Sequence, residues 1–225
     1  MSTFILKVIL LISCGLSFVI LFLYRGNNWP FNQQALEALI ACGIISLGTC
    51  LYILAVRKTK IGQQKMIKWG LYLGLLWTME IAMNNVLQPP LPQRDIYDDL
   101  FWAIIAIVIF ILSTGSSYQS NHVSDGIKTG FWSGLASGAV ACLTALIVIV
   151  FGMPYILSDA LNVAEWSARG ASSGIPTMSV YFAYQTLAGA FLHLLVLGVG
   201  MGLLLGLLGG IQGKGIKKIL SYSRR

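Results

Sequence analysis

The residues that could do chemistry in this sequence are few, and most of them lie inside long apolar stretches. Glu80 lies deep in one such stretch, with Asn84 one helical turn later and Asn85 beside it. Gln185 and His193 lie in another stretch, separated by two steps of four residues, so they share one face of a helix. Because a charge in hydrocarbon is costly, such residues usually face a partner or water. These five residues therefore form one candidate polar site inside the membrane.

A contact between Glu80 and His193 would connect two distant apolar stretches, and it has two interpretations. It is either a structural polar clasp between helices or a proton-responsive pair that binds a ligand, an ion or a proton. Substitution of Glu80 separates the two interpretations. A clasp predicts lost folding, whereas a transport site predicts normal folding with lost activity.

Motifs for catalysis, cofactors or metals are not evident in the sequence. Asp95, Asp98 and Asp99 are close together, but spacing alone is weak evidence for a cation site, and we expect a solvated acidic loop. The cysteines lie in apolar runs without C-x-x-C spacing, which favours small packing residues over disulfides or metal ligands. These cysteines are Cys14, Cys42, Cys50 and Cys142. We therefore expect no enzyme activity, no cofactor and no metal.

The elements that must position the polar site are membrane helices. Of the 225 residues, 56% are hydrophobic and only 10% are charged, against about 25% charged residues in soluble domains. Six apolar runs are each long enough to cross about 30 Å of hydrocarbon as a helix. They cover approximately residues 4–24, 35–56, 67–87, 100–118, 129–152 and 180–208. We expect an all-α polytopic transmembrane helix bundle of about six spans, with residues 1–225 as a single integral membrane domain.

The distribution of the basic residues predicts the orientation. The net charge of +7 is concentrated at the ends of apolar runs, which favours topology determinants and anionic lipid over nucleic acid. In a six-span model, twelve of the fifteen basic residues lie on the side of the termini, and only Arg25, Arg94 and Arg169 lie opposite. The twelve are Lys7, Arg57, Lys58, Lys60, Lys65, Lys68, Lys128, Lys214, Lys217, Lys218, Arg224 and Arg225. We therefore predict that both termini are cytoplasmic. The compact loops indicate a bacterial plasma membrane.

The connection between the fifth and sixth runs is expected to contain a short amphipathic helix on the external surface. Asp159 suits an N-cap position, Gly170 suits the position just after a helix, and apolar residues recur between them at helical spacing. Trp166 would lie at the level of the lipid headgroups. This helix is either a lid over an external opening or an interfacial connector.

Glycines recur every four residues in the last two runs and predict a helix-packing surface. Residues spaced by four share one helix face, and small residues allow the close backbone approach that holds membrane helices together. The rows are Gly126, Gly130, Gly134 and Gly138 in the fifth run, and Gly198, Gly202, Gly206 and Gly210 in the sixth. An antiparallel pair could close along them within one chain, the rows could form a homo-oligomer interface, or they could give a channel or gate flexibility. A smaller row, Gly70, Gly74, Thr78 and Ala82, offers the third run a similar face.

The sequence favours a non-enzymatic membrane scaffold, accessory or regulatory subunit, because the loops are short and packing motifs dominate. Its expected partners are the lipid bilayer and either another membrane protein or further copies of the chain, and no nucleic acid. The alternative is a small-solute or proton-coupled transporter that uses Glu80, Asn84 and His193. An intramembrane enzyme has thin support, since it would need a converging nucleophile or metal site.

Overall fold

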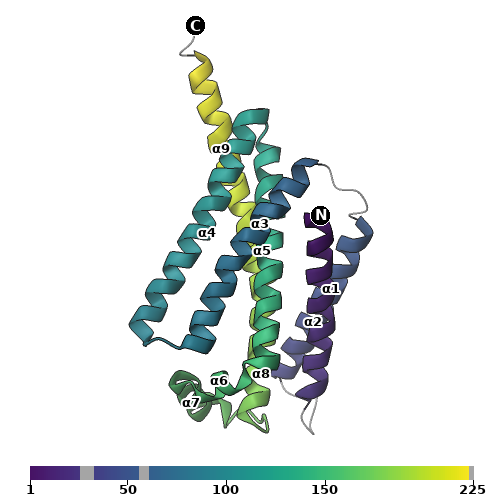
Figure 1. Cartoon of the computed structure of the whole chain (residues 1–225), viewed down its shortest axis with the longest axis vertical. Helices are drawn as coiled ribbons and strands as arrows, with labels where there is room; N and C mark the ends of the chain where they lie inside the picture. The colour runs from purple at the N-terminus through teal and green to yellow at the C-terminus, as the bar shows by residue number, and fades with distance from the viewer. Residues whose placement is uncertain (26–32, 56–60, 223–225) are drawn as a thin grey trace.

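A computed structural model describes residues 1–25, 33–55 and 61–222, and these ranges form helices joined by short connections, without a strand (Figure 1). Within them, five helical segments are long and apolar enough to cross a membrane. They are α1 (Ser2–Leu23), residues 35–54 of α2 (Gln33–Ala55), α4 (Leu91–Ser120), α5 (Val123–Phe151) and a continuous segment over residues 178–222. The prediction of an all-helical integral membrane protein is confirmed.

The predicted third run lies in α3 (Ile61–Ala82), which continues as a π-helix, η1 (Met83–Leu87). Helix α3 is not among the five membrane-length segments, because lysines and glutamines in its first two turns, together with Glu80, lower its mean hydropathy. Nevertheless, α3 lies alongside α5 for most of its length (Figure 1). The second predicted run ends at residue 56, which lies outside the described residues.

Helix α5 is the centre of the bundle and contacts α1, α3, α4, α8 and α9. Its small residues make this possible: it buries glycines, serines and alanines on several faces, so neighbouring backbones can approach closely from different directions. In its most apolar window 61% of the residues are buried, against 22–33% in the other four membrane-length segments. The remaining helices therefore surround α5 and expose apolar faces, as lipid requires.

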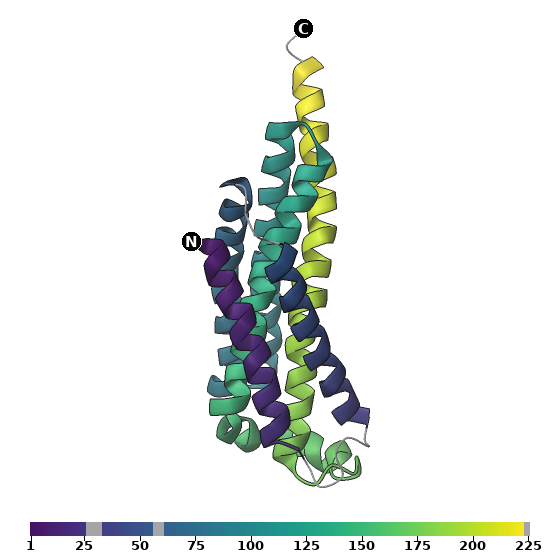
Figure 2. The same ribbon diagram turned by 90° about the vertical axis from the view of Figure 1, so that its right-hand side faces the viewer.

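The sixth predicted run is part of a much longer rod than expected. It comprises α8 (Met178–Leu192), the π-helical η3 (His193–Gly200) and α9 (Met201–Tyr222). Its 45 residues correspond to about 67 Å of helix, more than twice the hydrocarbon thickness. Figure 2 shows α9 extending past all other helices. The helix therefore continues beyond residue 208, where the predicted span ends, because the packing glycines continue to Gly213.

The acidic residues expected in a loop are helical instead. The connection after η1 is short: Gln88 adopts a left-handed φ of 49°, and α4 begins at Leu91, nine residues before the expected start of the fourth span. Pro92 lies in the first turn of α4, where its missing N–H removes no helical hydrogen bond. Asp95, Asp98 and Asp99 thus belong to α4, and the prediction of a solvated loop is wrong.

The segment between α5 and α8 folds into three short helical pieces: α6 (Met153–Ser158), α7 (Ala160–Glu165) and a π-helix, η2 (Trp166–Gly170). Asp159 caps α7 as expected, since its side chain accepts a hydrogen bond from the Leu161 N–H. Gly170 has a different role from the one predicted. It ends η2 without a positive φ, and a Cβ there would collide with the Trp166 ring.

Helix direction brings the described basic residues of the predicted cytoplasmic side to one end of the molecule. The starts of α1, α3 and α5 and the end of α9 all lie toward the upper end of Figure 1. These segments carry the lysines at positions 7, 65, 68, 128, 214, 217 and 218; we call this end the basic end. Arg57, Lys58, Lys60, Arg224 and Arg225 lie outside the described residues.

Candidate functional site

The two glycine rows of the sequence face each other in the structure. They run antiparallel, so that Gly126 lies opposite Gly210, and Gly138 opposite Gly198, with the intermediate glycines paired in the same register. A Cβ at Gly126 would lie 2.5 Å from the Gly210 Cα, and one at Gly138 would lie 2.8 Å from the Gly198 Cα. We call this contact the α5–α9 glycine seam. It lies within one chain, and it leaves no room for even a methyl group.

A second close contact on α9, which the sequence analysis missed, joins α9 to α4. A Cβ at Gly209 would lie 2.7 Å from the Phe110 carbonyl oxygen, and Gly213 packs on the Thr114 carbonyl. The Ser117 hydroxyl donates a 2.6 Å hydrogen bond to the Gly210 carbonyl. The signal was present in the sequence, since Gly209 and Gly213 are also four residues apart.

The smaller row on α3 packs against α5. Gly70 lies against Ser133 and Ala136, and the Thr78 and Thr144 hydroxyls are 2.9 Å apart. This packing fixes the face of α3 that points into the bundle. It thereby determines where Glu80, two residues after Thr78, is held.

The polar site is centred on Glu80, a side chain only 7% exposed. The Asn84 amide nitrogen donates to Glu80 Oε1 at 3.0 Å and also to Asp98 Oδ1 at 2.7 Å. One amide therefore bridges two carboxyl groups on different helices. Glu80 Oε2 and Asn84 Oδ1 are buried, and neither atom has a hydrogen-bond partner in the part of the chain that the structure describes. Asp98 was not among the predicted site residues, and it belongs to the site because α4 starts earlier than the sequence predicted.

A small cavity of about 120 Å³ lies beside Glu80, between α3, α5 and α8. Its polar lining comprises Glu80, Asn85, Thr186 and His193, and the rest is apolar or glycine. Pockets for organic ligands are usually about 300–1,000 Å³. This cavity therefore has room for several water molecules or a small ion, but not for an organic solute.

Glu80 and His193 line this same cavity, but no hydrogen bond joins the two side chains. His193 Nδ1 instead lies 2.8 Å from the Gly189 carbonyl one turn earlier, and its ring packs edge-on against Trp77 with centroids 5.4 Å apart. The hypothesised clasp therefore takes another form. Trp77 connects α3 to His193, and it also packs against Trp102 of α4.

The two remaining predicted site residues are oriented differently. The Asn85 amide lines the cavity but donates to the Ile81 carbonyl of its own helix at 2.9 Å. Gln185 is exposed and lies outside the cavity, since its amide donates to Glu165 Oε1 at 3.0 Å. Gln185 belongs to the contact between α8 and α7, not to the polar site.

An ion pair between a partly buried arginine and a buried aspartate lies at the end of the bundle opposite the basic end. Arg94 donates to both carboxylate oxygens of Asp159, at 2.7 and 3.2 Å, and the two side chains are 13% and 6% exposed. Gln88 Nε2 donates to the Tyr155 carbonyl at 2.6 Å in the same region. These bonds join the η1–α4 connection to the segment between α5 and α8. No local pattern could have predicted a pair separated by 65 residues.

No protein-family model matches this chain, and no curated protein and no solved structure matches it either. The functional argument therefore rests on the chain itself.

Proposed function

We propose that this chain is a six-span protein of a bacterial plasma membrane with both termini cytoplasmic. In this topology α3 crosses the membrane in addition to the five membrane-length segments. Two observations support this topology. Helix α3 runs antiparallel to α4 and lies beside α5 within the bundle (Figure 1). The described lysines lie at the basic end, whereas Arg25, Arg94 and Arg169 belong to segments at the opposite end.

The function that the geometry supports best is that of a non-enzymatic scaffold, accessory or regulatory subunit. The observation that carries this proposal is the far end of α9. Lys217 donates to the Gln119 carbonyl near the end of α4, so the following residues extend past that helix. In this projecting part Ile219 is 69% exposed, Leu220 44% and Tyr222 65%. Apolar side chains beyond the hydrocarbon are typical of a protein interaction surface.

The test is affinity purification of the full chain in a mild detergent, with mass spectrometry and native mass determination on the same sample. We expect a defined membrane-protein partner, and we expect Ile219→Ser with Leu220→Ser to release it. The matched control is Lys214→Ser with Lys218→Ser, which changes the same helix but keeps its apolar residues. A chain that purifies only as a monomer or homo-oligomer would refute the subunit function.

A second candidate function, proton or small-cation coupling, is favoured by one specific observation. Glu80 lines a cavity large enough for water or an ion, and its buried Oε2 atom has no hydrogen-bond partner among the described residues. Buried carboxyl groups of this kind mark proton and ion pathways in membrane proteins. The cavity volume argues against an organic solute as the substrate.

Proteoliposomes with a pH-sensitive dye inside test this second function. Glu80→Gln keeps the size of the side chain and an oxygen that can accept the hydrogen bond from Asn84, but it removes the carboxyl group. We expect the variant to fold normally and to lose proton or cation flux. Asp125→Asn is the control, because Asp125 forms a partly exposed ion pair with Lys128. Equal flux in wild type and Glu80→Gln would eliminate the coupling function.

A further inference from the structure

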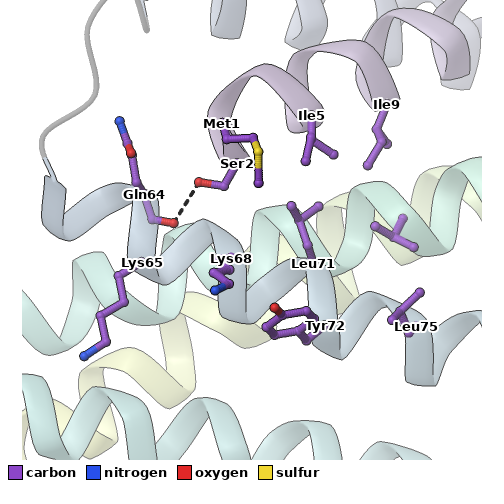
Figure 3. A pocket seen from close by; sticks show the side chains of 11 residues that line it. Met1, Ser2, Ile5, Ile9, Gln64, Lys65, Lys68, Leu71, Tyr72 and Leu75 are labelled. Carbon is purple, nitrogen blue, oxygen red and sulfur yellow. Dashed lines mark hydrogen bonds between the residues drawn. The ribbon is translucent and has the colours of Figure 1, made fainter.

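A recess with a volume of about 660 Å³ lies between α1 and α3. Figure 3 shows Ile5 and Ile9 of α1 facing Leu71 of α3 across it. Val140 of α5 also lines the recess, so it reaches from the surface to the central helix. It is therefore a groove between helices and not merely a flat apolar face.

Polar groups gather at one end of this groove. Ser2 donates to the Gln64 carbonyl at 2.9 Å and joins the starts of α1 and α3 (Figure 3). Lys65 and Lys68 also line the recess near this end of α3, and Lys68 Nζ lies 5.7 Å from the centroid of the Tyr72 ring. Among the described residues neither lysine is within ion-pair distance of a carboxylate, and no lining residue is acidic. The mouth of the groove therefore carries uncompensated positive charge.

The length of the groove matches one leaflet of a bilayer. From Lys65 at the mouth to Leu75 at the far end, α3 rises about 15 Å at 1.5 Å per residue. This is half of the roughly 30 Å hydrocarbon core. An apolar recess that faces lipid is most stable when an apolar chain fills it, because an empty one forfeits dispersion contacts.

We propose that this groove binds an anionic glycerophospholipid of the leaflet at the basic end. One acyl chain lies between Ile5, Ile9 and Leu71, and the phosphate lies between Lys65 and Lys68. Basic pockets between membrane helices bind anionic headgroups in this way. The site is separate from the Glu80 cavity and shares no lining residue with it.

Native mass spectrometry of the full chain in a mild detergent tests the proposal. The probes are phosphatidylglycerol and phosphatidylcholine with identical acyl chains. We expect phosphatidylglycerol to bind preferentially. Lys65→Gln with Lys68→Gln should weaken its binding about thirty-fold, since each lysine near the headgroup strengthens binding by a factor of about five. Both lysines are exposed, so the double variant should keep the helical content of the wild type.

Two further variants make the result decisive. Lys214→Gln with Lys218→Gln removes two lysines of the basic end that do not line the groove, and phosphatidylglycerol binding should remain. Leu71→Trp fills the apolar part, and binding should be lost although both groove lysines are kept. Equal binding of the two lipids, or an equal loss with the α9 control, would show only annular lipid or diffuse charge and would overturn the proposal.

Discussion

Replacing Gly130 with alanine is the most direct perturbation of the α5–α9 glycine seam. The new Cβ would lie 2.6 Å from the Gly206 Cα, whereas ordinary contact begins near 3.4 Å. It would also collide with the Gly202 carbonyl, so α9 must retreat by about 1 Å. A gap of this size forfeits up to half of the dispersion energy of the contacts that it opens.

The expected magnitude follows from two opposing effects. Overpacking of a close contact costs about 1–3 kcal/mol, and alanine recovers up to about 1 kcal/mol of helix propensity relative to glycine. Because any glycine-to-alanine change in a helix recovers the same propensity, we expect Gly130→Ala to have a free energy of unfolding about 1–3 kcal/mol lower than that of a glycine-to-alanine variant without a close contact. Gly43→Ala is the matched control, because a Cβ on α2 at that position meets nothing within 4 Å. It should be neutral or stabilising.

The assay is reversible unfolding in mixed micelles with increasing sodium dodecyl sulfate, followed by helical circular dichroism. Native mass determination on the same samples checks the alternative that the glycines form an interface between copies. If Gly130→Ala is as stable as Gly43→Ala, close approach across the seam does not stabilise the bundle and the reasoning fails. A change of oligomeric state without a change of stability would indicate that the rows act between chains.

Two further predictions concern the opposite end and the topology. Asp159→Ala should destabilise the protein by about 3 kcal/mol in the same unfolding assay, because it removes the cap of α7 and leaves Arg94, which is only 13% exposed, without its ion-pair partner. Asp125→Ala, at a more exposed pair, should cost less than about 1 kcal/mol, and similar costs for the two variants would refute burial as the cause. Cysteines introduced at the exposed residues Ser172 and Ser221 should react with an impermeant maleimide from opposite sides of the membrane. Ser172→Cys should react from outside, and Ser221→Cys only after permeabilisation. Labelling of both from one side would exclude the proposed topology.

Much of the helical architecture could be predicted because it depends on local composition. Apolar runs of about 20 residues identify spans, and the same pattern located most of the bundle. The helix ends were harder to predict, because the helices continue into segments of lower hydropathy. Helix α4 starts with polar residues around Asp95, and α9 continues through Gly213 and Lys217. In both cases a neighbouring helix, not lipid, covers part of the extension.

The candidate site was predicted less completely, because its partners are distant in sequence. Periodicity placed Glu80 and Asn84 on one helix face, and they do interact. It could not place Asp98, which reaches them only through the early start of α4. Nor could it show that His193 packs against Trp77, or that Asn84 and not His193 binds the Glu80 carboxyl group.

The four-residue repeat of the glycine seam has a consequence for the vertical position of α9. If α9 slid along α5 by one step of four residues, about 6 Å, three of the four glycines on α5 would again meet a glycine of the other row. The seam is thus degenerate in register, and contacts that break its period must select one alignment. These are the Trp77 contact with His193 and the bond from the Lys217 amine to the Gln119 carbonyl, because no equivalent side chain lies four residues away on the rod. Two non-repeating contacts therefore set how far α9 protrudes from the bundle.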